Sequence, residues 1–174
     1  MAKEKIVYLK DRRKPTAPVS ASSDSYAEQV LLLNLKSATV AIAVKRVVEI
    51  LPHQPLVDIA RRDTPVEGVV NVRGRIIPVI DLGLKIVNVP ARQSPKPRII
   101  AVEIEKESVG LLIDEVADRL CLLTEPPRPA LAGMAQPYFS GVVSVDLRDI
   151  PLLDVDQLFT PAERDQIASI RKSF

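Results

Sequence analysis

The chain has 174 residues, of which 47% are hydrophobic and 26% are charged, and its mean hydropathy is +0.11. A domain usually takes about 100 to 200 residues, so this length fits one domain or two small packed lobes and excludes a multidomain enzyme. No apolar run approaches the roughly 20 residues that span a bilayer, and the charged start lacks a signal-peptide core. We therefore expect a cytoplasmic protein that does not insert into a membrane.

The beginning of the chain is polar and basic. Residues 1–23 hold six Lys or Arg against two Asp or Glu, a local charge of +4, so the chain's total of +2 leaves −2 for the remainder. Residues 10–27 are rich in Pro, Ser and Ala, with too little apolar surface to offset the entropy lost on ordering. We predict a flexible tail at 1–27 and a folded part without the basic excess that grips phosphate.

Eight apolar runs of strand length, rich in Val, Ile and Leu, follow this tail. They are Val30–Leu35, Val40–Val44, Val69–Val72, Ile76–Ile80, Arg98–Ile104, Val109–Ile113, Gly141–Val145 and Ile150–Val155. Fifteen prolines against six glycines argue against long helices, so the pattern predicts an all-β fold. Aromatic residues are only 3%, which removes the stacking platforms that single-stranded nucleic-acid binders use.

The chain also repeats itself. The segment Gly68–Leu82 aligns without a gap with Gly141–Val155, and eight of the 15 positions are identical, including a Gly, a Pro and an Asp. Weaker similarity upstream extends the repeat units to about 30–82 and 99–155. Units of this size are marginal alone, because small domains bury a smaller share of their surface. We therefore predict one lobe from each unit, a core shared between the lobes, and a crossover at 83–97.

Each repeat contains one stretch in which apolar residues recur at i, i+3, i+4 and i+7, the spacing of a helical stripe. These are Val44, Val47, Val48 and Leu51 in the first unit, and Ile113, Val116, Ala117 and Leu120 in the second. The spacing predicts a short helical segment after the first hairpin of each unit.

A further helix is predicted at the end of the chain, over residues 161–174. Thr160, Pro161 and Glu163 fit the N-cap, N1 and N3 positions of a capping box. Ile167, Ile170 and Phe174 would then lie on one face of this helix.

The sequence carries no positive sign of catalysis. It has no phosphate-binding loop, dinucleotide fingerprint or nucleophile elbow, and a single Cys and a single His nearly exclude a metal cage. His53 is interpreted as a loop residue and Cys121 as a small core residue. Asp81 and Asp154 are equivalent acids at strand ends, where carboxylates most often accept backbone N–H groups. A hydrolase using these two acids is an alternative without a supporting base, so we expect no catalytic residue, cofactor or metal.

One difference between the two copies points to a binding residue. Arg73 and Gly74, at the turn of the first Gly-led hairpin, are replaced by Asp146 and Leu147 in the second. The fold can therefore build this turn without an arginine, and a turn holds a guanidinium outward with its donors available. Arg73 is thus a candidate contact for a partner, and the alternative is a solvated turn residue.

Four segments follow one another in this order: AIAVKRVVEIL, GVVNVRGRIIPVIDL, VGLLIDEV and GVVSVDLRDIPLLDVDQL. Together they resemble the CheW-like domain of bacterial chemosensory adaptors over residues 28–160. The resemblance implies two packed five-stranded SH3-like β-barrels and a noncatalytic scaffold. It implies as partners a CheA-type histidine kinase, through its regulatory domain, and the cytoplasmic tip of methyl-accepting chemoreceptors. It also implies a stand-alone adaptor that reaches the membrane only through receptor arrays.

The resemblance also implies which residues bind partners. They are Asn71, Arg73 and Gly74, which match the family's N-L-R-G turn, and Val47 and Glu49, which match the V-x-E segment of the adaptor–kinase contact. The first hairpin, KSATVAIAV, lacks the family's common Gly turn and aromatic residue, which bears on the particular receptor or kinase. An alternative from a different class is a nucleic-acid-binding β-barrel module with a basic tail, whereas the adaptor binds no nucleic acid.

Overall fold

A computed structural model of the chain describes residues 26–59 and 64–174, except for the side chains of 118 and 119. Of the tail predicted at 1–27, residues 1–25 therefore lie outside the described part. The strands in the described part are β1 (Glu28–Leu35), β2 (Ala38–Ala43), β3 (Val47–Leu51), β4 (Val66–Val72), β5 (Arg75–Asp81), β6 (Arg98–Ile104), β7 (Glu107–Ile113), β8 (Glu115–Leu123), β9 (Phe139–Val145) and β10 (Arg148–Leu153). The helices are α1 (Leu82–Val87) and α2 (Pro161–Arg171), with 3₁₀ turns η1 (Val44–Arg46), η2 (Ala91–Gln93) and η3 (Val155–Gln157). All eight predicted strands are present, and the mostly-β fold is confirmed.

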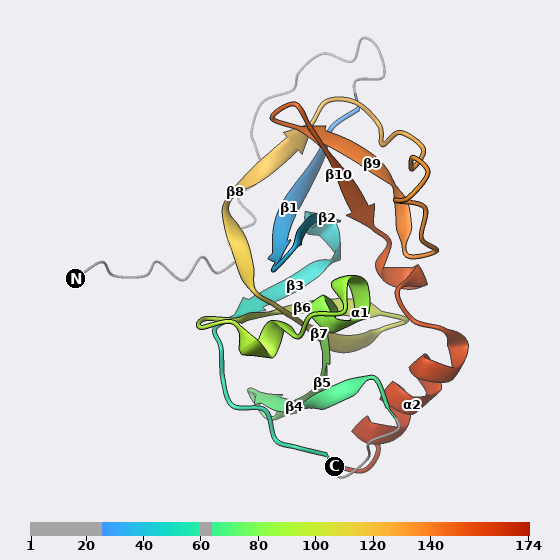
Figure 1. Cartoon of the computed structure of the whole chain (residues 1–174). Coiled ribbons are helices and arrows are strands. Elements are labelled where there is room, and N and C mark those ends of the chain that lie inside the picture. The colour runs from blue at the N-terminus through green and yellow to red at the C-terminus, as the bar shows by residue number, and fades with distance from the viewer. Residues whose placement is uncertain (1–25, 60–63) are drawn as a thin grey trace, which may run out of the picture.

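The strands form two five-stranded sheets, one in each of two lobes (Figure 1). The β1 lobe has the strand order β8-β1-β2-β10-β9, and the β6 lobe has the order β3-β6-β7-β5-β4. Paired strands are antiparallel except β2 with β10 and β5 with β7. The edge strands β8 and β9 contact each other, which curls the sheet of the β1 lobe toward a barrel.

Each lobe combines strands of both repeats, so the prediction of one lobe per repeat is wrong. The hairpin β1–β2 of the first unit joins β8, β9 and β10 of the second, while β6–β7 of the second unit joins β3, β4 and β5. The chain changes lobe at η1 and again at Asp114, between β7 and β8. The segment 83–97, expected to cross between lobes, instead connects β5 and β6 within one lobe. Sequence similarity detects the duplication, but burial of apolar faces decides which strands pair across it.

Three apolar cores result from the alternation of side chains along these strands. The largest lies between the lobes and takes residues from both sheets, such as Leu33 and Ile42 on one side and Ile100 and Leu111 on the other. A smaller cluster fills each lobe, and Cys121 belongs to that of the β1 lobe. The prediction that two lobes share a core is therefore confirmed.

Most of each helical segment predicted within the repeats is a bulged strand, so the second prediction is wrong and the first holds only for the 3₁₀ turn η1. The first segment is η1 followed by β3, and the second runs from Ile113 at the end of β7 into β8. In β3, Val47 and Glu49 pair with neighbouring residues of β6, so Val48 between them is a bulge. A bulge adds one residue and shifts the alternation of side chains, which reproduces the apolar spacing of a helical stripe.

The glycines that lead the two repeated hairpins are explained by packing. Val57 and Arg128, in the connectors of the two units, each form an isolated β-bridge to the hairpin of their own unit. A Cβ added to Gly68 would lie 2.8 Å from the carbonyl oxygen of Val57, and one on Gly141 would lie 2.6 Å from that of Arg128. Both copies therefore require a residue without a side chain at this position.

The two repeat-equivalent acids accept backbone N–H groups, as predicted, and each caps the helical turn that follows its strand. Asp81 is 2% exposed, and its Oδ1 accepts the backbone N–H groups of Leu84 at 2.9 Å and Ala91 at 3.0 Å. Asp154 Oδ1 accepts the N–H of Asp156 at 3.0 Å, at the start of η3. Both carboxylates therefore accept backbone N–H groups and fix the chain where it leaves β5 and β10.

Helix α2 begins at the predicted capping box. Thr160 accepts the N–H of Glu163, while the Glu163 carboxylate accepts the N–H of Thr160. Ile167 and Ile170 are buried, but the helix ends before Phe174, which is 66% exposed, so the prediction that all three share one face is wrong. None of the helices in residues 26–59 and 64–174 is long and apolar enough to cross a membrane.

Candidate functional site

The tip of the β4–β5 hairpin is the first candidate surface. Arg73 and Gly74 form its two-residue turn with φ of 53° and 80°, and type I′ turns need positive φ at both positions. The Asn71 Oδ1 atom accepts the Gly74 N–H at 2.8 Å and holds the turn closed. Asp146 and Leu147 build the same turn in the second hairpin, with φ of 49° and 63°. The turn therefore does not need the guanidinium, as the comparison of the repeats indicated.

An ion pair joins this tip to another edge of the same sheet. The Nη2 atom of Arg73 lies 2.9 Å from Oε1 of Glu49, and the two side chains are 62% and 25% exposed. Glu49 belongs to β3, one edge strand of the β6 lobe, and Arg73 directly follows β4, the other edge strand, so the pair links the two edges of the sheet. The structure thus brings together Asn71, Arg73, Gly74 and Glu49. Sequence reasoning missed the contact, because 24 residues separate its two partners.

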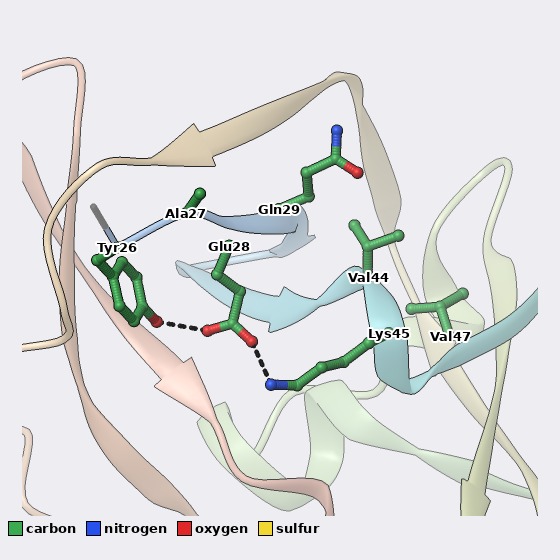
Figure 2. Close-up of a pocket in the computed structure, with 7 residues that line it drawn as sticks. All are labelled: Tyr26, Ala27, Glu28, Gln29, Val44, Lys45 and Val47. Carbon is green, nitrogen blue, oxygen red and sulfur yellow. Dashed lines mark hydrogen bonds and ion pairs between the residues drawn. The ribbon is translucent and has the colours of Figure 1, made fainter. Parts of the chain in front are cut away.

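Val47, the remaining candidate from the sequence, lines a second surface. This surface is an open hollow, called the β3 hollow below, formed by Tyr26, Ala27, Glu28, Gln29, Val44, Lys45 and Val47 (Figure 2). Val44 and Val47 pack against the core between the lobes, so Val47 lies at the edge of the core as expected. Figure 2 shows the carboxylate of Glu28 between Tyr26 and Lys45, away from the two valines. The hollow therefore has an apolar side and a charged side.

The charged side of the β3 hollow is a fixed hydrogen-bonded group. Lys45 Nζ lies 2.6 Å from Oε1 of Glu28, and the Tyr26 hydroxyl donates to Oε2 at 2.6 Å. The bonds from Lys45 and Tyr26 hold the pKa of Glu28 below its usual value, while the bond to Glu28 and burial raise the pKa of Tyr26 to about 12. At neutral pH the hollow thus presents an ionised carboxylate with its two donors.

Sequence reasoning missed Tyr26, Glu28 and Lys45. Tyr26 was assigned to the tail, but its ring packs against the core of the β1 lobe, so the folded part includes it. The sequence feature that could have placed Tyr26 in the folded part is its position as an aromatic residue four positions before the first apolar run, Val30–Leu35. Among residues 26–59 and 64–174, no group of three or more His, Cys, Asp or Glu is placed to hold a metal ion.

The fold and these surfaces define a class of duplicated, two-lobed β domain whose candidate residues lie on an exposed hairpin tip and in an open hollow. The family model of the CheW-like domain matches residues 29–163, and the chain belongs to this family.

Individual relatives agree with this assignment. The chemotaxis protein CheW of Klebsiella aerogenes is 26% identical over 155 residues, which cover 87% of this chain and 93% of the relative. A probable chemotaxis protein CheW of Rhizobium etli is 30% identical over 118 residues, covering 66% and 71% of the two chains. The crystal structure of the scaffolding protein TtCheW from Thermoanaerobacter tengcongensis matches with a TM-score of 0.70 and 23% identity, over 83% of this chain and 95% of that one. This last likeness shows that the fold is shared.

Proposed function

We propose that the chain is a noncatalytic chemotaxis adaptor that couples methyl-accepting chemoreceptors to a CheA-type histidine kinase. The match of the CheW-like family model over residues 29–163 carries this proposal. Relatives that cover most of the chain are named as chemotaxis proteins, and a protein of the same fold is named as a scaffolding protein. The adaptor works in the cytoplasm and reaches the membrane through receptor arrays. No match and no contact among the described residues favours the nucleic-acid alternative.

An adaptor needs surfaces that two partners can occupy at the same time. The hairpin tip is polar, and its Arg73 forms an ion pair with Glu49 of β3, so these two side chains act on the same partner. In this proposal the partner is the regulatory domain of the kinase. A charged, exposed tip of this kind suits the rim of a protein interface, where charges set register and encounter rate.

The β3 hollow offers the second surface. Its apolar side, Val44 and Val47, is extended by Leu120 and Leu122 of β8, which are 44% and 62% exposed and lie opposite Leu31 and Gln29 of β1. An open apolar strip beside a charged group suits a helix that buries one face, because recognition of an amphipathic helix needs apolar anchors on a groove. In this proposal the hollow takes the helical tip of the receptor, so Val47 is assigned to the receptor and not to the kinase contact that the resemblance implies.

The proposal is tested by reconstitution from the full-length chain, a CheA-type kinase and the cytoplasmic fragment of a chemoreceptor. Val47→Glu should weaken sedimentation with the receptor while kinase binding remains. Val48→Glu is the matched control, because Val48 is the adjacent residue, is 51% exposed and does not line the hollow. Failure of the unmodified chain to bind either partner, or equal losses for both substitutions, would contradict the proposal. Salt-sensitive RNA binding that disappears on deletion of residues 1–23 would support the alternative instead.

A further inference from the structure

A second groove opens in the β1 lobe, between the β1–β2 hairpin and β10, and is called the β2–β10 groove below. Its apolar lining includes Leu35, Ile86, Met134, Phe139 and Ile150. β2 and β10 pair at only two positions, near the ends of both strands. Both strands pair along their whole length with β1 and β9 on their other sides, but their beginnings do not pair with each other, and the groove lies between these beginnings.

The β6 lobe contains the equivalent place, and there it is filled. The β6–β7 hairpin is the repeat equivalent of β1–β2, and β7 pairs in parallel with β5 just as β2 pairs with β10. Helix α2 lies along this side of the β6 lobe (Figure 1) and contacts β5. Its Ile167 and Ile170 are buried in the core, and its Arg164 and Arg171 form ion pairs with Glu105 and Glu107 of the hairpin. The fold therefore seats an amphipathic helix at this position.

No described helix covers the β2–β10 groove in the same way. α1 follows β5 as η3 follows β10, but α1 ends after six residues, and Asn88 at its C-cap has φ of 56° and turns the chain away. Ile86 is the residue of α1 that lines the groove. We propose that this groove binds an amphipathic helix of a partner protein, seated as α2 is seated in the β6 lobe. This inference is independent of the two surfaces assigned above.

The charges on the rim define the chemistry of the partner helix. Lys36 occupies the position that Glu105 occupies in the other repeat, so the charge that faces the helix is reversed. Arg148 is a second exposed cation on the rim, and within the described residues neither side chain takes part in an ion pair. Asp149 on the rim is paired with Arg128. The partner helix therefore carries an acidic residue where α2 carries Arg164, and further acidic residues on it would face Arg148.

This charge pattern disfavours two other occupants. Helix α2 of a second copy, seated in the same way, would place Arg164 beside Lys36, and Arg148 adds a second positive charge to the same rim. The segment 1–23 of the same chain, with six basic residues against two acids, would meet the same repulsion. Like charges across an interface cost affinity and reject wrong partners. The observations therefore favour a helix with two apolar residues three positions apart and acidic residues at its flanks.

The test uses labelled peptides of residues 160–172 and fluorescence anisotropy with the full-length chain. An acidic peptide with Arg164→Glu and Arg171→Glu should bind saturably, and the unmodified peptide should bind more weakly. An acidic peptide that also carries Ile167→Ser and Ile170→Ser should not bind. In the full-length chain, Lys36→Glu combined with Arg148→Glu should weaken the acidic peptide roughly threefold to tenfold, as expected for two exposed ion pairs. Lys96→Glu, an exposed lysine outside the groove, is the matched control and should leave the affinity unchanged.

Backbone NMR shifts then locate the peptide. Shifts confined to the β1–β2 hairpin, β10 and α1 support the proposal. The proposal is overturned if the acidic peptide does not bind, if the groove variant keeps full affinity, or if the shifts fall elsewhere. Tighter binding of the unmodified basic peptide also overturns it and would indicate a second copy or the basic N-terminal segment as the occupant. The melting temperature of the groove variant should equal that of the unmodified chain, because both substituted side chains are exposed.

Discussion

Arg73→Ala should separate binding from stability. The substitution removes an exposed ion pair with Glu49, which is worth about 0–1 kcal/mol, and leaves the turn held by Asn71 and Gly74. The melting temperature should therefore fall by a few degrees at most. In the complex, the same side chain would supply a charge-assisted hydrogen bond, and losing it costs about 1.5–3 kcal/mol. Affinity for the kinase should then fall roughly tenfold to hundredfold.

The assay combines thermal unfolding with calorimetric titration of the regulatory domain of the kinase. Arg75→Ala is the matched control, because Arg75 is also exposed and lies two residues away at the start of β5. Glu49→Gln, alone and combined with Arg73→Ala, completes a double-mutant cycle. If Glu49 positions the guanidinium, the two losses should be less than additive. A melting temperature lowered by many degrees, unchanged affinity, or an equal loss for Arg75→Ala would refute the assignment of Arg73.

Four further outcomes follow from the fold. Gly141→Ala should lower the free energy of unfolding by about 1–3 kcal/mol, because its Cβ would meet a carbonyl oxygen; an unchanged urea midpoint would contradict this close approach. Leu147→Gly should raise stability by about 0.5 kcal/mol, because a fully exposed Leu at φ of 63° is strained, and a lower melting temperature would argue against that strain. Burial opposes ionisation of Glu163, but its hydrogen bonds with Lys85 and the N-cap hold its pKa below the usual value. Its stabilising effect should therefore be present at neutral pH and disappear as the pH falls through the folded pKa, whereas Glu163→Gln should reduce this dependence in urea titrations at neutral and acid pH. The two halves of the chain, divided within 88–97, should each fail to unfold cooperatively alone, since each lobe needs strands of both; a cooperative melt of one half would be inconsistent with the exchanged hairpins.

The sequence predicted the parts of the fold that depend on short-range pattern. Apolar runs of strand length, rich in Val, Ile and Leu, located eight strands, and the identities between Gly68–Leu82 and Gly141–Val155 revealed the duplication. The capping box at Thr160 located the start of α2, because its residues lie within one turn of each other. The order of the family segments indicated a CheW-like domain, and the change from Arg73 to Asp146 identified the tip of the hairpin.

Beyond the 3₁₀ turn η1, the helical predictions within the repeats failed for a physical reason that the sequence does not display. The apolar spacing in 44–51 and 113–120 is compatible with a helix, but burial against the neighbouring strands selects an extended backbone with a bulge. A local pattern cannot distinguish these outcomes, since tertiary contacts override a weak helical preference.

The tertiary structure alone decided which residues meet. β1 pairs with β8 although about half of the chain separates them, and Arg73 reaches Glu49 between two edges of one sheet. The same applies to the β3 hollow, where Tyr26 and Lys45 converge on Glu28, and to the β2–β10 groove, which exists because two strands separate. These contacts depend on how two repeats exchange hairpins to bury one common core. The hydrophobic effect is non-directional, so an apolar face gains the same free energy whichever apolar face covers it. The repeated sequence therefore determines that each strand has an apolar face, and the packing of the whole chain determines which two faces meet.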